Sequence, residues 1–194
     1  DDRNGDDDLY VQRISVGSGT INIEWGSEGK LVCDASGDQT SPRVALYGED
    51  KTIITWEDVR NVYPPDGIAY TDAYYQILDG NGNEQLTVNG VPACSGGWDI
   101  IKPRVKAENS VAYIVWEDRR NGAQTSDIYA QKINSVGSTE WGDGLEITTS
   151  TLSQTEPRLT TDGNGGVYIV WEDHRDSDQS GVDIYAQHVN SSGT

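Results

Sequence analysis

Residues 114–120 read IVWEDRR, and this stretch decides the fold because the chain contains it three times. Residues 54–60 read ITWEDVR and residues 169–175 read IVWEDHR, so the three tryptophans follow one another at intervals of 60 and 55 residues. Self-similarity at a period of this length is typical of repeat proteins, in which each period is one supersecondary unit. The period therefore predicts an array of repeats.

Two further markers keep constant positions around the motif. An aromatic segment ending in glutamine follows it each time, and a Pro-Arg pair with an apolar residue after it precedes it. The Pro-Arg pairs are Pro42-Arg43, Pro103-Arg104 and Pro157-Arg158, and the aromatic segments are 73–76, 128–131 and 184–187. Counted from the aspartate after each Trp-Glu, the chain divides into about three and a third repeats of 55–60 residues: 1–57, 58–117, 118–172 and a partial unit, 173–194.

Short alternating segments rich in β-branched and aromatic residues predict four β-strands in each repeat. One full cycle comprises 144–149, 157–161, 166–172 and 183–190, with a hairpin turn at 162–166. Four short antiparallel strands in every repeat predict an all-β fold made of β-propeller blades. A string of small β-sandwiches is the alternative, but each sandwich needs about seven strands and about 100 residues, which is longer than one period.

The composition is strongly acidic. The 194 residues include 14 Lys and Arg against 32 Asp and Glu, a formal charge of −18. This charge argues against nucleic acid, whose phosphates bind Lys and Arg clusters, and against anionic membrane surfaces. No apolar run reaches the ~18 residues of a membrane span, so we expect no membrane insertion. The opening residues are polar, and we expect any secretory signal to lie upstream of them.

The markers together resemble a repeat found in large secreted bacterial proteins. The resemblance rests on the order Asp-Ile-Tyr-Ala-Gln, Gly, Trp, Gly, Gln, Pro-Arg-Leu and Asp-Gly-Asn-Gly-Gly-Val-Tyr-Ile-Val-Trp-Glu-Asp-x-Arg, and it covers the whole chain. Repeats of this kind are interpreted as sialidase-like or related β-propellers, often beside surface-sorting domains. The resemblance implies a bacterial protein that is secreted or held at the cell surface, and it implies no particular activity.

The Trp-Glu-Asp-x-Arg motif has two interpretations. Its carboxylates could serve as the acid and base of a hydrolase, but an active site is usually unique, whereas a motif present in every repeat maintains the fold. We therefore expect each tryptophan to pack between blades, and each aspartate to pair with the nearby arginine or cap the following turn. The residues of this structural motif are Trp56, Asp58, Arg60, Trp116, Asp118, Arg120, Trp171, Asp173 and Arg175.

The arginines of the Pro-Arg pairs are the main argument for catalysis. Sialidases hold a carboxylate with convergent arginines and use a tyrosine nucleophile, and Arg43, Arg104 and Arg158 could converge on one axis. Alternatively, each arginine pairs with a local acidic residue, and the sialidase turn Ser-x-Asp-x-Gly-x-x-Trp is absent from the sequence.

Because the blades look uniform, we predict that the chain is not an enzyme. The predicted function is a non-catalytic extracellular module for binding, adhesion, or scaffolding of a cell surface or filament. A glycan-binding or sialidase-like glycoside hydrolase propeller fragment is the alternative.

Two acidic loops, 1–8 and 173–183, are candidate calcium sites. Calcium takes about 6–8 hard oxygen ligands, and both loops gather Asp, Asn and Ser oxygens. Neither loop has EF-hand spacing, and a solvated turn is the alternative interpretation. The candidate ligands are Asp6, Asp7, Asp8, Asp176, Asp178 and Asp183.

Cys33 and Cys94 each lie nine residues before the proline of their repeat. Equivalent positions in successive blades are too far apart for the Cα separation below ~7 Å that a disulfide needs, so we expect two free, partly buried thiols. The partial repeats predict open sheet edges, which pair readily with other strands. Neighbouring repeats or other copies of the same chain are therefore the expected partners, and glycans are candidate ligands.

Overall fold

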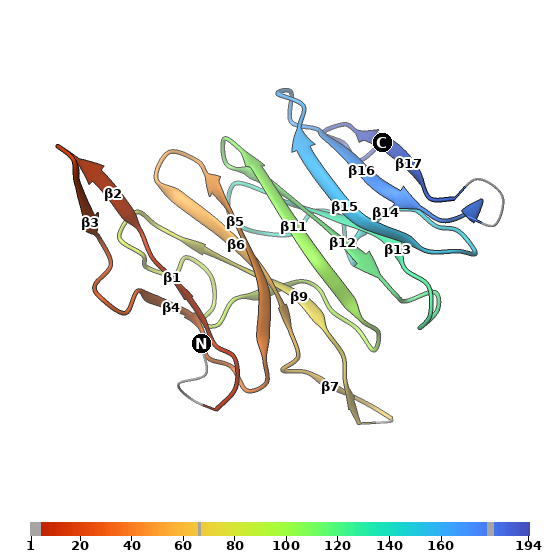
Figure 1. The fold of residues 1–194 in the computed structure, drawn as a ribbon, viewed down its shortest axis with the longest axis horizontal. Coiled ribbons are helices and arrows are strands. Elements are labelled where there is room, and N and C mark those ends of the chain that lie inside the picture. The colour runs from red at the N-terminus through yellow and green to blue at the C-terminus, as the bar shows by residue number, and fades with distance from the viewer. Residues whose placement is uncertain (1–4, 66, 178–180) are drawn as a thin grey trace.

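The structure is a computed structural model that describes residues 5–65, 67–177 and 181–194. All of its numbered secondary-structure elements are β-strands, in agreement with the predicted all-β class (Figure 1). The first eight strands are β1 (Leu9–Val11), β2 (Ile14–Gly17), β3 (Thr20–Ile23), β4 (Lys30–Cys33), β5 (Gln39–Tyr47), β6 (Lys51–Asp58), β7 (Val62–Tyr63) and β8 (Ile68–Ala69). The others are β9 (Asp72–Leu78), β10 (Val91–Cys94), β11 (Ile100–Glu108), β12 (Val111–Asp118), β13 (Asp127–Ile133), β14 (Leu145–Thr148), β15 (Gln154–Thr161), β16 (Val167–Asp173) and β17 (Asp183–Val189).

These strands form four successive antiparallel sheets. Two of them have four strands, in the order β5-β6-β9-β10 and β11-β12-β13-β14. On one side of this pair lies the two-stranded sheet β1-β4, and on the other lies the three-stranded sheet β15-β16-β17. The four strands predicted for one cycle are confirmed as β14, β15, β16 and β17, to within a few residues at their ends. Two short hairpins, β2-β3 and β7-β8, are additions to the repeat.

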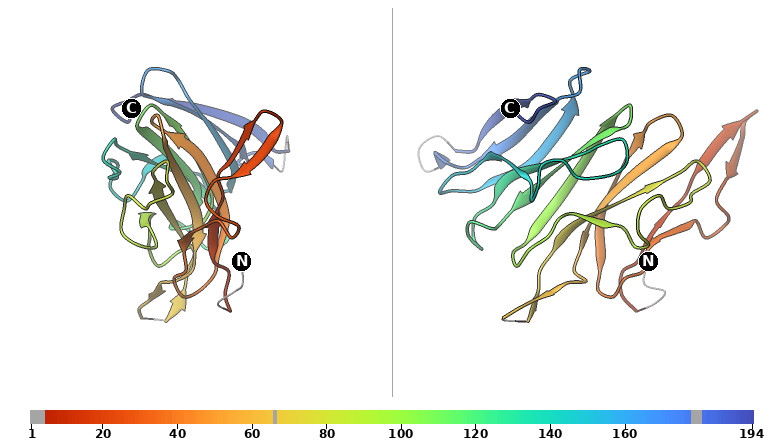
Figure 2. Two further views of the ribbon diagram at one scale, coloured as in Figure 1. Left: turned by 90° about the vertical axis from the view of Figure 1, so that its left-hand side faces the viewer. Right: turned by 180° about the vertical axis from the view of Figure 1, so that it is seen from behind.

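The sheets follow one another face to face, as the blades of a propeller do (Figure 2). Strands β5, β11 and β15 are the first strand of their sheets and lie side by side across the front of Figure 1. The repeat units counted from the aspartate after Trp-Glu begin between the second and third strand of a sheet, so each unit contributes to two sheets.

Three apolar clusters fill the spaces between neighbouring sheets. Leu9, Val32 and Cys33 pack against the face of the next sheet that carries Trp56 and Tyr74. The second and third clusters repeat this arrangement around Trp116 and around Trp171. All three motif tryptophans are buried, so the core consists of interfaces between blades, and no sheet has a core of its own.

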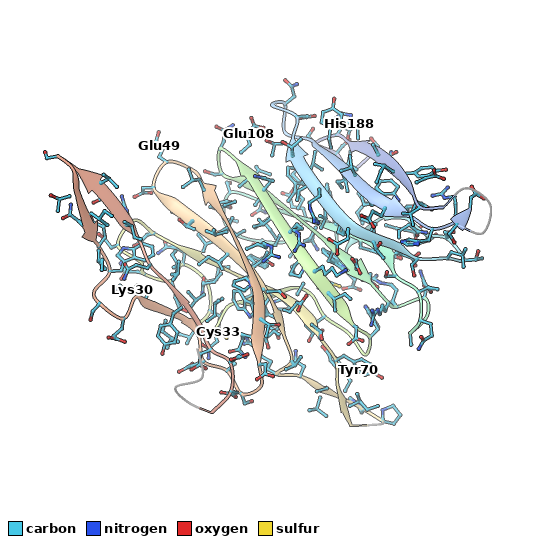
Figure 3. All side chains as sticks on the ribbon, viewed as in Figure 1. Lys30, Cys33, Glu49, Tyr70, Glu108 and His188 are labelled. Carbon is cyan, nitrogen blue, oxygen red and sulfur yellow. The ribbon has the colours of Figure 1, made fainter. Side chains whose placement is uncertain are left out.

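Both cysteines are buried and free, as predicted from their equivalent positions (Figure 3 labels Cys33). Burial raises the pKa of the Cys33 thiol to about 11 and that of Cys94 to about 12. The thiols therefore pack as small apolar side chains and stay protonated at neutral pH. Among the described residues, no helix is long and apolar enough to cross a membrane.

Candidate functional site

The first strands of three sheets, β5, β11 and β15, carry the same β-bulge. The pairing of β5 with β6 shifts between Thr40 and Arg43, and the equivalent shifts occur between Ile101 and Arg104 and between Thr155 and Arg158. In each case an X-Pro pair lies opposite one residue of the second strand. Proline suits the second position of a bulge because it has no N–H to pair with the neighbouring strand.

The residue before each of these prolines has a left-handed backbone. Its φ is 54° at Ser41, 53° at Lys102 and 52° at Glu156. This conformation costs a residue with a side chain roughly 1–2 kcal/mol, so it persists only where other contacts stabilise it. The same strained conformation at three equivalent positions is a property of the repeat.

A carboxylate from the preceding blade holds this backbone in place. The backbone N–H of Lys102 donates to Glu57 Oε1 at 2.6 Å, and the N–H of Glu156 donates to Glu117 Oε1 at 2.8 Å. These two glutamates are the middle residues of the Trp-Glu-Asp motif. We call this contact the glutamate clamp: a motif glutamate accepts the N–H of the bulge residue in the next blade.

The side chains at the bulge position differ from blade to blade. Ser41 Oγ donates to Glu57 Oε2 at 3.0 Å, and Lys102 Nζ lies 3.1 Å from Glu117 Oε1. In the third blade the equivalent pair consists of two acids, Glu156 and Glu172. Lys102 Nζ also lies 2.7 Å from Glu156 Oε1. The innermost strands thus present a serine, a lysine and a glutamate at one repeated position.

The arginines after the prolines occupy equivalent positions on the neighbouring strands β5, β11 and β15. Burial lowers the pKa of Arg104, and the charges of Arg43 and Arg158 lower it further. Glu156 takes up part of this positive charge, with an oxygen 3.0 Å from Arg158 Nη2 and 3.9 Å from Arg104 Nη2. Each guanidinium also donates to the carbonyl of the proline before it.

Of the two interpretations of these arginines, pairing with a local acid therefore holds for Arg104 and Arg158. For Arg43 the described residues include no carboxylate partner. The other interpretation, in which the three arginines converge, is supported by the charges of Arg43 and Arg158, which both lower the pKa of Arg104. The strands β5, β11 and β15 thus present a cluster of three arginines, Lys102 and Glu156, which we call the axial cluster.

The tryptophan, aspartate and arginine of each Trp-Glu-Asp-x-Arg motif form hydrogen bonds with one another. Asp118 is fully buried and accepts hydrogen bonds from Trp116 Nε1 at 2.8 Å, from the Arg120 N–H at 3.0 Å and from Arg120 Nε at 2.8 Å. The arginine also lies over the ring of Tyr129, 4.0 Å from its centroid. The same bonds join Trp56, Asp58 and Arg60, and also Trp171, Asp173 and Arg175.

The residues predicted to bind calcium lie at two separate places. Asp6 Oδ2 accepts the Gly37 N–H at 2.8 Å, the Asp7 carbonyl accepts the Gln39 N–H at 2.7 Å, and Asp8 is buried. Asp176 and Asp183 lie at the other end of the array, and Asp178 is outside the described residues. Within the described part of the chain, no three His, Cys, Asp or Glu side chains are grouped so that they could hold a metal ion. Calcium binding stays a prediction.

No protein-family model and no curated protein matches the sequence. Solved structures do match the fold. The endo-arabinase from Bacteroides thetaiotaomicron matches 96% of this chain and 77% of its own, with a TM-score of 0.53 and 16% identity. The α-L-arabinanase of Penicillium chrysogenum, complexed with arabinobiose, has a TM-score of 0.57 and 14% identity, and the match covers 96% of this chain and 58% of that one.

The α-L-arabinofuranosidase of Fusarium graminearum, of the GH93 family, has a TM-score of 0.56 and 10% identity, over 93% of this chain and 55% of that chain. The chain thus spans little more than half of two of these three proteins. At such identities the likeness shows the fold alone, which is a β-propeller.

These matches correct the functional prediction. We expected a non-catalytic module and no enzyme, because the blades look uniform in sequence. The three solved structures named above are glycoside hydrolases, and the blades of this chain are not uniform on the strands β5, β11 and β15. The tryptophan and the aspartate of every Trp-Glu-Asp-x-Arg motif are buried, whereas Ser41, Lys102 and Glu156 differ at one equivalent position. Comparing the residue before each Pro-Arg pair would have found this variation.

Proposed function

We propose that this chain is part of a glycoside hydrolase propeller and that the axial cluster is its carbohydrate site. The observation that carries the proposal is the set of different side chains at the bulge position, which places Glu156 beside Arg104, Arg158 and Lys102. The likeness to glycosidase propellers supports the same class of reaction. Secretion or display at a cell surface stays part of the proposal, since it is drawn from the repeat resemblance.

Hydrolysis of a glycosidic bond uses two carboxyl groups on either side of the scissile bond. Hydrogen bonding from Lys102 is the main cause that lowers the pKa of Glu156, and Arg158 lowers it further. Glu156 is therefore ionised at neutral pH, which suits a nucleophile or a base and does not suit a proton donor.

The arginines define the class of sugar. A guanidinium binds a carboxylate through two parallel N–H···O bonds, and an arginine with no carboxylate partner in the described chain is free to do so. Arg43 meets this condition, and Arg104 holds the equivalent position on the neighbouring strand β11. The proposed substrate is therefore a glycan that contains an acidic sugar.

Calorimetry and hydrolysis assays test the proposal. The probes are a sialyl disaccharide and a uronic acid disaccharide, with a neutral arabino-disaccharide for comparison. We expect binding of an acidic probe, weakened about tenfold or more by Arg43→Gln, because bonds between charged groups contribute about 1.5–3 kcal/mol. We expect Glu156→Gln to lower the hydrolysis rate by roughly 10²–10⁴-fold.

Glu49→Gln is the matched control. Glu49 is exposed at the tip of the β5–β6 hairpin, away from the axial cluster (Figure 3), and we expect it to leave binding and hydrolysis unchanged. Binding of the neutral probe alone would refute the acidic substrate. If the folded protein neither binds nor hydrolyses any of the three sugars, the proposed function is wrong.

A further inference from the structure

A cavity lies at one end of the sheet β11-β12-β13-β14, between the loop after β12 and the segment after β14. Its volume is about 530 Å³. The sheet has four strands and is flanked by another sheet on each side. We call this cavity the blade-end pocket, and its described lining residues all have polar side chains: Asn121, Thr125, Asp127, Thr149, Ser150 and Thr151.

Asp127, the first residue of β13, is the buried group of this pocket, with an exposed fraction of 2%. Its Oδ1 accepts the backbone N–H of Ser150 at 3.1 Å, and its Oδ2 accepts Asn121 Nδ2 at 3.0 Å. An ionised carboxylate has about four positions at which it accepts hydrogen bonds. The described residues thus leave Asp127 able to accept a further donor from a molecule in the pocket.

The preceding sheet, β5-β6-β9-β10, contains the same arrangement. Its carboxylate is Asp72, which begins β9 as Asp127 begins β13. Asp72 Oδ1 accepts the N–H of Gly96 at 3.0 Å, and Oδ2 accepts Asn61 Nδ2 at 2.8 Å. These are the two bonds that Asp127 accepts from the equivalent residues of its own blade, so the two places can be compared directly.

In that preceding blade, a tyrosine of the same chain occupies the place. The loop after β6 forms the hairpin β7-β8, which carries Tyr63. The hydroxyl of Tyr63 donates to Asp72 Oδ2 at 2.7 Å and is also hydrogen-bonded to Ser95. The Cβ of Tyr63 lies 3.8 Å from the position that a Cβ on Gly97 would take. The buried carboxylate therefore has a third hydrogen-bond donor in this blade, and that donor is the hydroxyl of a six-membered ring.

The residues around Tyr63 are the counterparts of the residues that line the blade-end pocket. Counted back from the first residue of the following sheet, Ser95 corresponds to Thr149 and Gly97 to Thr151. Tyr63 thus contacts the counterparts of Asp127, Thr149 and Thr151. The chain itself shows that a ring fits at this place with its hydroxyl on the carboxylate.

The side chains that differ between the two blades indicate the chemistry of the ligand. Tyr63 lies beside the ring of Tyr70, with the centroids 6.2 Å apart, and two glycines of that blade face it. In the blade-end pocket the glycines are replaced by Ser150 and Thr151, and no aromatic residue is among the described lining residues. Hydroxyl side chains both donate and accept hydrogen bonds. They suit a ring with several hydroxyl groups, which is a sugar, better than a phenol with one.

Charge distinguishes this pocket from the axial cluster. Its described lining residues include no Lys or Arg, and Asp127 is the one acidic residue among them, so the pocket repels an acidic sugar. We propose that the blade-end pocket is a second carbohydrate site, which binds a neutral sugar ring. A hydroxyl of that sugar donates to Asp127 Oδ2 as the hydroxyl of Tyr63 donates to Asp72. This site is separate from the proposed hydrolase site and does not depend on it.

Titrations followed by calorimetry and by NMR of the backbone amides test the proposal. The probes are two neutral glycosides, methyl β-D-galactopyranoside and methyl β-D-glucopyranoside, with glucuronic acid as an acidic sugar and N-acetyltyrosinamide as a phenol. We expect at least one neutral glycoside to bind in the millimolar range and to shift the amide signal of Ser150, because this N–H is bonded to Asp127. Glucuronic acid should leave that signal in place.

Three variants locate the site. Thr149→Trp fills the pocket and should abolish binding of the neutral glycoside. Thr149→Val removes one hydroxyl and should weaken binding about 2–10-fold, and Asp127→Asn, which replaces the accepting oxygen by a donor, should weaken it about tenfold or more. Thr149 is exposed, so its variants should keep the circular dichroism of the native sheets. Thr139→Val is the matched control, at an exposed residue of the loop after β13, and it should leave binding unchanged.

Three results would overturn the proposal: neither neutral glycoside binds the folded protein, binding leaves the Ser150 signal unmoved, or Thr149→Trp leaves the affinity unchanged. Binding of N-acetyltyrosinamide without either glycoside would also refute a sugar site and would assign the pocket to a tyrosine side chain of another protein. None of these readouts measures hydrolysis or the binding of an acidic probe by Arg43. The second site can therefore fail while the proposed function holds, and the reverse is equally detectable.

Discussion

The carboxylate of Glu57 on one blade accepts the backbone N–H of Lys102 on the next blade, at 2.6 Å. The same carboxylate accepts the hydroxyls of Thr40 and Ser41 from its own blade. The Glu57 side chain therefore connects the bulge of its own blade with the bulge of the next blade. A contact between repeats thus explains the motif glutamates Glu57 and Glu117.

Removing this acceptor should destabilise the protein. Glu57→Ala leaves the N–H of Lys102 without its partner, and an unsatisfied buried donor costs about 1–3 kcal/mol. We expect a loss of this size in urea unfolding, whereas Glu49→Ala, at an exposed hairpin tip, should change the free energy of unfolding by less than about 0.5 kcal/mol. Equal effects from the two substitutions would show that the clamp contributes nothing.

The same aspartate substitution should cost more in an interior blade than in the sheet β15-β16-β17. Asp118→Ala leaves the Arg120 charge without its carboxylate, and breaking a buried pair costs about 3–5 kcal/mol. The Arg175 side chain is 36% exposed, against 19% for Arg120, so water compensates more of its charge after Asp173→Ala. Chemical unfolding of the two variants should rank them in that order; the reverse ranking would contradict it.

The acid dependence of stability should report on Asp173. Burial alone would raise its pKa, but hydrogen bonds from Arg175 and Trp171 outweigh burial and lower it from 3.8 to about 2. The folded state therefore binds the proton less readily than the unfolded state, and this contribution to stability is present above about pH 4. It should be lost as the pH falls from about 4 to 2. Asp173→Asn should flatten the loss over this range; an unchanged profile would refute the assignment.

The sequence predicts the repeat, the strands and the buried motif because all three follow local rules. Alternating apolar residues define strands, and Trp56, Trp116 and Trp171 share one environment because each repeat builds the same interface. The axial cluster does not follow such a rule. The left-handed backbone at Lys102 depends on a carboxylate of another blade, and the effect of the Arg43 charge on the pKa of Arg104 depends on how the blades pack. Uniform motifs also hid the variation at Ser41, Lys102 and Glu156, which led to the wrong prediction of a non-catalytic module.

The two thiols should be unreactive until the protein unfolds. Burial raises the pKa of Cys33 to about 11 and that of Cys94 to about 12, and only the thiolate attacks a disulfide reagent. At pH 8 the native protein should react slowly with such a reagent, and the unfolded, unreduced protein should release two equivalents at once. Fast labelling of the native state, or fewer than two thiols after unfolding, would contradict the buried, unbonded cysteines.

The last prediction concerns a glycine that contacts the motif tryptophan. Gly144 has a φ of 102°, and a Cβ added to it would lie 2.7 Å from Trp116 Cζ2. Its equivalent Gly90 meets Trp56 in the same way, so the repeat needs a bare backbone where the outer strand crosses the indole ring.

Gly144→Ala therefore combines backbone strain of about 1–3 kcal/mol with overpacking of about 1–3 kcal/mol, since the ring that the new methyl group meets is fully buried. Gly142 is the matched control: its φ is 55° and nothing lies within 4 Å of an added Cβ. Gly142→Ala should cost only the left-handed strain, about 1–2 kcal/mol. Thermal unfolding followed by tryptophan fluorescence measures both variants, and Gly144→Ala should lower the melting temperature clearly more. If the two variants melt alike, the close approach to Trp116 does not constrain this position.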